Sequence, residues 1–222
     1  MAAALVAPSL SGCAGPQYTY VRDDDGATYF KVPSSWRQID QRVLEQKLFG
    51  DTESATVQAL KKLTWIVAYD AQAPPSADHL LIGPEGADDK PFALAKVRKL
   101  TETEMNQVSL NTLRNSINLP VAISETERQK METDVENPFK EFELLDDKVL
   151  PVQDGVRGVR SVFNFRLAGG PVQTFDQTAF LSADGTQVST LLIRCSAKCY
   201  REKAAEIDMI AQSFKVKRLL NQ

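Results

Sequence analysis

The stretch VRGVRSVFNFRL, residues 156–167, alternates apolar and polar side chains along most of its length. Val159 and Phe163 fall on one side of this alternation, and Arg160 and Asn164 fall on the other. Successive side chains of a β-strand point to opposite faces, so a period of two residues indicates a strand. Because one face is apolar and the other polar, we predict a half-buried strand of an antiparallel sheet over 156–167.

Turn sequences extend this strand into a meander. Gly169-Gly170-Pro171 leads into a second apolar stretch over 173–181, and Ser182-Ala183-Asp184-Gly185 leads into a third over 186–195. Gly, Pro and Asp are favoured in tight turns because of their backbone preferences and local hydrogen bonds. These residues predict a three-stranded antiparallel meander, and a further strand over 140–145 precedes it.

The remaining elements are predicted from composition and periodicity. β-branched and aromatic residues predict strands over 27–32, 64–69 and 92–98, and a short final strand is possible over 215–217. Apolar residues at helical spacing predict helices over 41–49, 53–63, 101–117 and 201–214. Segment 71–91 is expected to be a long surface loop, and 125–136 to be an exposed helix or a mobile excursion. This order of elements predicts a single α+β domain.

Two short motifs resemble those of a known fold group. Val32-Pro33-Ser34-Ser35-Trp36 follows the first predicted strand, and Ser213-Phe214 ends the last predicted helix. Together with the order of elements from Thr28 to Val216, they are similar to PsbP-like proteins, a group that includes photosystem PsbP, the DcrB lipoproteins and actinobacterial lipoproteins such as LpqN. The resemblance implies an antiparallel β-sheet sandwiched between helices, used for binding or assembly without shared catalytic residues. We expect Trp36 to pack under the sheet edge.

The N-terminal segment has the features of a lipid-attachment signal. Residues 1–12 are nearly all small or apolar, and they end in Leu10-Ser11-Gly12 directly before Cys13. This resembles the lipobox of bacterial lipoproteins, in which the cysteine sulfur is diacylated before cleavage. Two acyl chains anchor a protein stably to a membrane, whereas one binds only marginally. We predict a signal-peptide remnant over 1–12, a lipidated Cys13 with a linker over 13–26, and a domain over 27–218 on the extracytoplasmic side of the cell membrane.

The same segment departs from the usual signal peptide in one respect. Residues 1–12 contain no Lys or Arg, although secretory signals begin with a positively charged region. We therefore expect the natural start codon to lie upstream of Met1. The alternative interpretation of this segment is a disordered, Ala-rich terminus in which Cys13 is incidental.

The two other cysteines predict a structural disulfide. Cys195 and Cys199 are separated by three residues, and an exported protein meets an oxidising compartment in which nearby thiols pair. The spacing differs from the redox motif CxxC, and no further Cys or His cluster completes a zinc site. We expect a Cys195–Cys199 bond, with Cα atoms within about 7 Å of each other, and no metal site.

The net charge and the absence of known catalytic motifs limit the classes of function that the sequence supports. The formal net charge of −3 lacks the positive field that favours phosphate backbones, so no nucleic-acid partner is expected. The sequence lacks the nucleophile elbow, the phosphate loop, HExxH and the dinucleotide fingerprint. We predict a lipid-anchored binding or assembly module without catalytic activity or cofactor, whose partner is an envelope protein or a small apolar ligand. The alternative is an extracytoplasmic hydrolase that uses the single histidine, His79.

Overall fold

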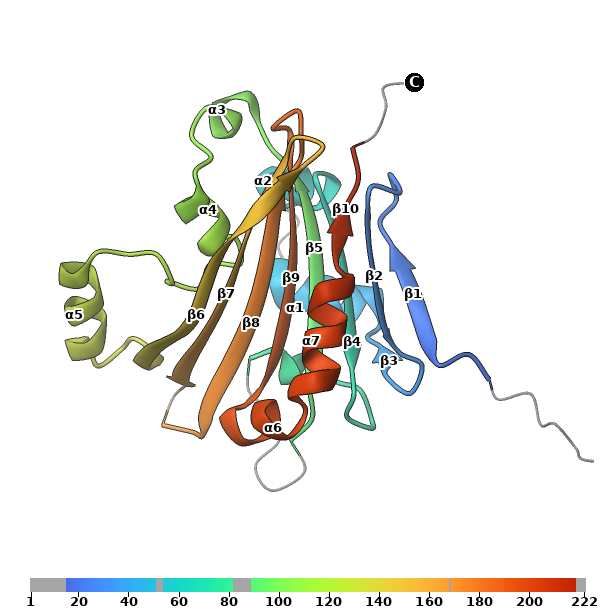
Figure 1. Ribbon diagram of the computed structural model, residues 1–222. Coiled ribbons are helices and arrows are strands. Elements are labelled where there is room, and N and C mark those ends of the chain that lie inside the picture. Colours follow the sequence, from blue (N-terminus) through green and yellow to red (C-terminus); the bar gives the residue numbers. More distant parts are fainter. Residues whose placement is uncertain (1–14, 51–53, 82–88, 168, 219–222) are drawn as a thin grey trace, which may run out of the picture.

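A seven-stranded antiparallel sheet forms the centre of the molecule (Figure 1). The computed structural model describes residues 15–50, 54–81, 89–167 and 169–218. In spatial order the strands are β3 (Arg37–Gln38), β4 (Thr64–Asp70), β5 (Phe92–Lys99), β9 (Gln187–Ser196), β8 (Val172–Leu181), β7 (Val156–Leu167) and β6 (Phe139–Gln153). Strands β7, β8 and β9 are consecutive neighbours, which confirms the predicted meander.

One face of this sheet is covered by a second, smaller sheet and two helices. The small sheet has the order β1 (Tyr18–Arg22), β2 (Thr28–Pro33) and β10 (Lys215–Val216), and beside it lie α6 (Ala197–Glu202) and α7 (Ala204–Ser213). Phe30, Ile193 and Phe214 belong to the apolar core between these layers. Trp36 is buried in the same core, as expected for a structural aromatic residue.

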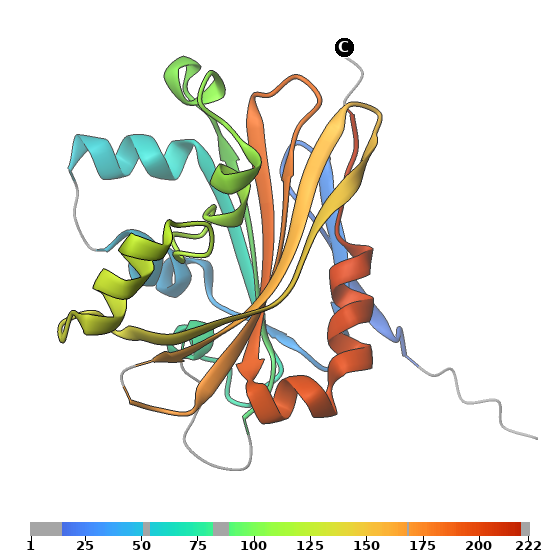
Figure 2. The ribbon, with the colours of Figure 1, turned by 60° about the vertical axis from the view of Figure 1, so that its left-hand side comes forward.

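The opposite face carries the other helices, which lie across the sheet from α7 (Figure 2). They are α1 (Gln41–Phe49), α2 (Ala55–Lys62), the 3-10 helix η1 (Ala77–Leu80), α3 (Glu102–Met105), α4 (Leu110–Arg114) and α5 (Glu125–Thr133). Phe163 and Phe175 stack beneath them with ring centroids 5.5 Å apart. None of the helices in the described part of the chain has both the length and the apolar character needed to cross a bilayer.

The α+β class and the antiparallel sheet between helix-bearing layers are confirmed, but three element boundaries are corrected. The predicted linker over 13–26 contains β1, because Val21 buries its side chain against the large sheet. The predicted helix over 101–117 is two helices, because the Ser109 hydroxyl accepts the Thr112 N–H and starts a new helix. The last helical region begins earlier than predicted, because Ser196 caps α6 before α7 begins.

The outer strand β6 is longer and less regular than the predicted strand over 140–145. Its pairing with β7 shifts register at three places, between Lys140 and Glu143, Leu144 and Asp146, and Leu150 and Gln153. Such bulges increase local twist and interrupt the regular row of backbone groups that an edge strand presents. The irregular strand β6 therefore makes this edge of the sheet a poor template for pairing with another strand.

Candidate functional site

A groove of about 720 Å³ opens above β5 on the helix-covered face. Leu94, Lys96 and Arg98 of β5 line it together with Thr64 of β4. The ends of α1 and α2 also line it, as does the segment between Glu104 and Asn118. We call this feature the β5 groove. In Figure 2 these helices and the segment that carries α3 and α4 lie on the same side of the sheet.

Lys96 lies at the floor of the β5 groove and also supports α4. Its Nζ donates a hydrogen bond of 2.8 Å to the Ser116 carbonyl, just beyond the end of the helix. Gln177 similarly donates from Nε2 to the carbonyls of Leu113 and Arg114. The last carbonyls of a helix lack the regular partners of the helix interior, and these side chains donate hydrogen bonds to carbonyls at and just beyond the end of α4. Both residues therefore hold the end of α4 against the sheet.

The charge of Lys96 is not balanced by a carboxylate in the groove. Glu104 is the only acid among the described lining residues, and its Oε1 is 2.6 Å from Nη1 of Arg98. Burial lowers the pKa of Lys96 to about 8, and the charge of Arg98 acts in the same direction. The Thr64 hydroxyl is also buried and has no hydrogen-bond partner in the described part of the chain. The groove thus offers an ammonium group to a ligand that carries an acceptor.

The lowered pKa of Lys96 gives a testable pH dependence. Between about pH 8 and 10.5 the unfolded chain binds a proton that the folded chain has released, so the free energy of unfolding rises with pH. We expect Lys96 to contribute a rise of about 2 to 3 kcal/mol across this window. Urea unfolding near both ends of the window should show a larger rise for the wild type than for Lys96→Met. An equal rise in both proteins would contradict the buried, charged state of Lys96.

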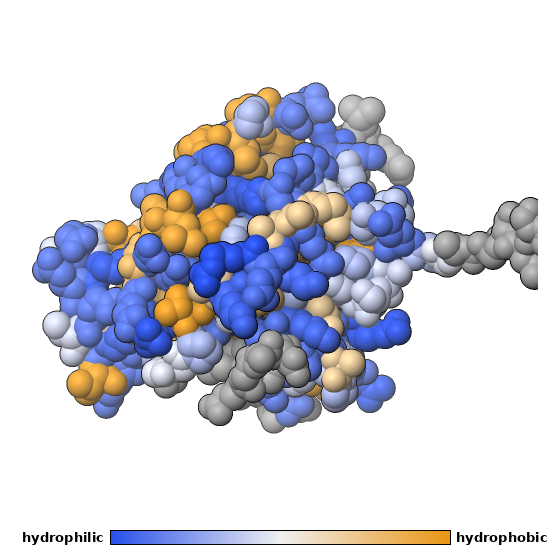
Figure 3. All heavy atoms as spheres, turned by 60° about the horizontal axis from the view of Figure 1, so that its bottom comes forward, coloured by the Kyte–Doolittle hydropathy of each residue, from blue (hydrophilic) through white to orange (hydrophobic). Residues whose placement is uncertain are grey.

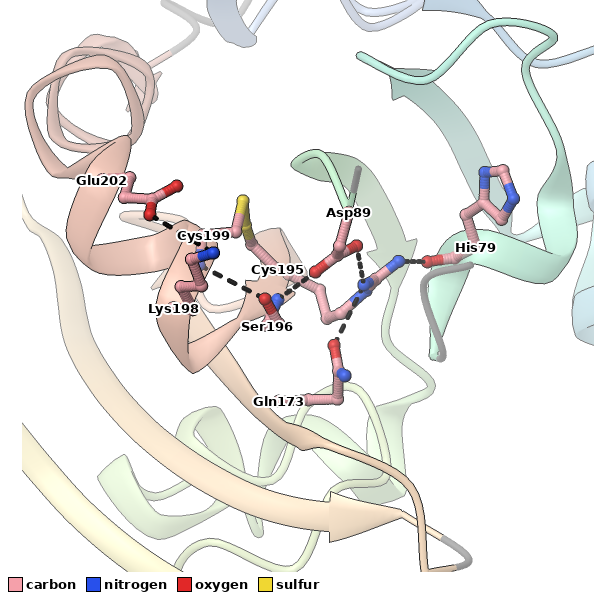
Figure 4. The surroundings of a disulfide bond; sticks show 9 residues. His79, Asp89, Gln173, Cys195, Ser196, Lys198, Cys199 and Glu202 are labelled. Atoms are coloured by element: carbon pink, nitrogen blue, oxygen red, sulfur yellow. Dashed lines mark hydrogen bonds and ion pairs between the residues drawn. A yellow bond between two sulfur atoms is a disulfide. The ribbon is translucent and has the colours of Figure 1, made fainter. Parts of the chain in front are cut away.

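A second group of polar side chains is buried at the end of the sheet near α6 (Figure 4). Arg194 of β9 is fully buried, and its Nη1 lies 3.1 Å from Asp89 Oδ1 and 3.0 Å from Gln173 Oε1. Its Nη2 donates to the His79 carbonyl. Burial lowers the pKa of Arg194, while the charges of Asp89 and Asp70 oppose this effect. The guanidinium therefore joins β8, β9, η1 and the segment before β5.

Asp89 connects this group to the predicted disulfide. Its second carboxylate oxygen accepts the Ser196 N–H, directly before α6. Cys195 and Cys199 are joined in the structure with Cα atoms 5.7 Å apart, which agrees with the predicted pairing distance. The Asp89 carboxylate and the two sulfur atoms lie within 4.8 Å of one another. Because the sulfurs are bonded to each other and Asp89 contacts Arg194 and Ser196, this trio has no free ligand for a metal ion.

His79 forms a pair with Asp70 in the same region. Its Nδ1 is 2.7 Å from Asp70 Oδ2, and the Asp70 carboxylate also accepts the N–H groups of Gln72 and Ser76. A hydrolytic triad needs a nucleophile beside such a pair. No hydroxyl or thiol in the described ranges forms a hydrogen bond with the His79 ring. The contacts observed close the turn after β4, which is a structural role.

The sequence analysis did not identify Lys96 or Arg194. Both were placed in predicted strands, but neither was assigned a site. Each lies in a strand with buried apolar residues on both sides, FALAKVRK for β5 and QVSTLLIRCS for β9. Strands that are apolar on both faces are buried on both faces, so a cation in such a run is a signal for a buried charge. Cys13, the predicted lipidation site, lies outside the described residues.

The molecular surface at this end of the sheet is mainly hydrophilic. Figure 3 shows it from the side on which α6 lies, with apolar patches separated by polar residues. Where the described residues form this surface, its apolar residues are therefore divided into separate patches. The β5 groove combines apolar walls with an unbalanced cation, and it is the better candidate for a binding site.

Comparisons with known proteins support the fold. No protein-family model matches the sequence, and no curated protein matches it. Among solved structures, the chain is similar to cyanobacterial PsbP (CyanoP) from Synechocystis sp. PCC 6803, with 12% identity, a TM-score of 0.52, and coverage of 95% of this chain and 98% of that chain. This likeness shows a PsbP-like fold and nothing about function.

Two weaker similarities concern the same architecture. The Ran-binding protein Mog1p of Saccharomyces cerevisiae is 11% identical, with a TM-score of 0.44 and coverage of 90% of this chain and 96% of that chain. LpqN of Mycobacterium tuberculosis, described as involved in cell envelope biogenesis, is 14% identical, with a TM-score of 0.43 and coverage of 90% and 91%. Neither value is high enough to add to the fold assignment.

Proposed function

We propose that the chain is a lipid-anchored binding module on the extracytoplasmic side of a bacterial membrane, and that the β5 groove is its ligand site. The observation that carries the proposal is the groove itself, in which Lys96 lies at the floor without a carboxylate partner. Its volume of about 720 Å³ falls within the range of small-molecule sites, about 300 to 1,000 Å³. The anchor rests on the sequence before and including Cys13.

The lining residues favour a ligand with an apolar part and a hydrogen-bond acceptor. Leu48, Phe49, Leu60 and Ile117 supply apolar surface, and Lys96 supplies the donor. Leu60 is 38% exposed, so the apolar wall is accessible from solvent. A carboxylate attached to a hydrocarbon chain meets both requirements, because the ammonium of Lys96 would pair with the acid. An envelope protein that presents an acidic side chain beside an apolar one would meet the same two requirements.

Binding of a fluorescent fatty acid tests the groove. We expect the full chain to bind cis-parinaric acid saturably, and Leu60→Glu to weaken the affinity at least about tenfold, since it replaces apolar surface by a like charge. Gln58→Glu is the matched control, because Gln58 is exposed on the same helix and the net charge changes equally. Absence of saturable binding by the wild type, or equal affinities of both variants, would overturn the ligand assignment.

Metabolic labelling tests the anchor. Cells that express the full-length precursor with its native signal sequence are grown with an alkyne fatty acid, and the purified protein is examined for label. We expect label in the wild type and in Ser9→Ala, and none in Cys13→Ala, since the thiol is the attachment point. An unlabelled wild type, or label that persists in Cys13→Ala, would reject the lipid anchor.

A further inference from the structure

Most outward positions of the small sheet carry an aromatic or a basic side chain. Alternation along β1 and β2 turns Val21, Phe30 and Val32 inward, where they are buried. Outward positions that alternate with them, together with Lys215 of β10 and Lys217 directly after it, form what we call the aromatic-basic face. It consists of Tyr18, Tyr20, Arg22, Tyr29, Lys31, Lys215 and Lys217. Figure 1 shows β1 at the outside of the molecule, far from β6.

Rings and cations are interleaved on this face. Tyr20 pairs with Lys31 across β1 and β2, and Arg22 pairs with Tyr29. Nζ of Lys31 lies 4.2 Å from the centroid of the Tyr18 ring, and Nζ of Lys217 lies 4.9 Å from that of Tyr29. Tyr20 is 78% exposed, an unusually high exposed fraction for an aromatic side chain.

Acidic side chains are absent from the outward positions of these strands, within the residues that the structure describes. The nearest acids in the sequence lie in the turn between β1 and β2. There the buried Asp23 carboxylate accepts the Thr28 N–H, Asp25 is paired with Lys99 at 3.1 Å, and Asp24 is exposed, so it is the acid left to offset the four basic residues of the face. The face is therefore positive although the whole chain has a net charge of −3.

We infer that the aromatic-basic face lies against the anionic headgroups of the membrane to which the chain is anchored. Tyrosine has an apolar ring and a polar tip, and lysine and arginine extend a charged end from an apolar stem, so all three suit the bilayer–water boundary. Basic residues near an anionic surface are attracted to it. The inference rests on the proposed anchor for its location: Cys13 precedes Tyr18 by five residues, a span of at most about 17 Å.

This placement determines whether the β5 groove opens toward the membrane or away from it. The small sheet covers one face of the large sheet, whereas the groove lies on the other. With the aromatic-basic face on the bilayer, the groove opens away from the membrane. A ligand or partner would then reach the groove from the aqueous compartment.

Vesicle binding by the unlipidated chain tests the face without help from the anchor. The full chain with Cys13→Ala is mixed with phosphatidylcholine vesicles that contain or lack phosphatidylglycerol, and sedimentation measures the bound fraction. We expect binding only to the anionic vesicles, and at least about a tenfold loss of affinity when Lys31→Glu and Lys217→Glu are combined. Lys61→Glu with Lys62→Glu is the matched control on α2, with the same charge change.

A single substitution tests the face even if the charge-reversal variant fails to fold. Tyr20→Ala removes a side chain that is mostly exposed, so we expect it to keep the fold and to weaken vesicle binding. The inference is overturned if the unlipidated chain ignores anionic vesicles, if both charge-reversal pairs lose affinity equally, or if a single-stranded oligonucleotide binds the face while vesicles do not. Lipid label at Cys13 without vesicle binding would reject this face alone, whereas vesicle binding without label would reject the anchor alone.

Discussion

Replacing Arg194 by Ala is expected to lower the free energy of unfolding by about 3 to 5 kcal/mol, the usual cost of removing one partner of a buried ion pair. The side chain is fully buried and contacts the Asp89 carboxylate, the Gln173 amide oxygen and the His79 carbonyl. Without the guanidinium, the Asp89 side chain, which is only 7% exposed, is left without its cation. Urea unfolding monitored by circular dichroism measures the loss.

Two further variants separate the buried charge from general effects of losing an arginine. Arg157→Ala removes an exposed arginine from β7 and should change stability by no more than about 0.5 kcal/mol. Arg194→Lys keeps the charge but lacks the planar fork that reaches several acceptors at once, so we expect it to recover only part of the loss. Equal stabilities of Arg194→Ala and Arg157→Ala would show that the buried contacts do not stabilise the fold.

Asp176→Ala should have a comparable effect on the other face of the sheet, again about 3 to 5 kcal/mol. Its carboxylate is fully buried and accepts two hydrogen bonds from Arg160, at 2.9 and 2.7 Å, and one from the Tyr200 hydroxyl at 2.9 Å. The hydrogen bonds with Asp176 raise the pKa of Arg160, and burial raises the pKa of Tyr200. Removing the carboxylate takes two hydrogen bonds from Arg160 and the hydrogen bond that links Tyr200 of α6 to β8.

Asp208 provides the matched control for this variant. It also contacts Arg160, with Oδ1 2.8 Å from Nη1, but its side chain is 48% exposed. Partly exposed ion pairs contribute about 0 to 1 kcal/mol, so Asp208→Ala should have a small effect. Replacing Arg160 by Met and Asp176 by Leu together should be less damaging than Asp176→Ala alone, because the only carboxylate that loses its cation is the partly exposed Asp208. A double variant as unstable as Asp176→Ala would contradict this account.

The parts of the fold that follow from local sequence were predicted well. The strand over 156–167 agrees with β7 at both ends, because turns bound its alternation of apolar and polar residues. The expected burial of one face only is wrong, because Val162 and Asn164 on the more polar side are buried as well. The helix over 41–49 likewise agrees with α1, which Asp40 caps. The break at Ser109 was missed, because the apolar spacing continues through it and only the second cap reveals a new helix.

Contacts between distant segments account for most of what the sequence analysis missed. Strand β1 has a single buried residue, Val21, and its pairing with β2 across a turn gives little periodic signal. The β5 groove combines residues from α1, α2, β4, β5 and the segment around α4, so no local pattern describes it. Lys96 looks like one polar position in a strand, and its burial depends on α4, which lies elsewhere in the sequence. The Cys195–Cys199 pair could be predicted from the sequence because both residues lie within one short motif.

The irregular strand β6 has a consequence for a chain held at a surface. Proteins tethered to a bilayer diffuse in two dimensions, so copies collide far more often than at the same amount in free solution. Under these conditions a straight, open sheet edge would invite strand-to-strand joining between neighbours. The three register shifts of β6 and the shortness of β3, only two residues long, leave neither edge of the large sheet well suited to it. Under the proposed anchoring, joining of neighbouring copies through this sheet would then be disfavoured.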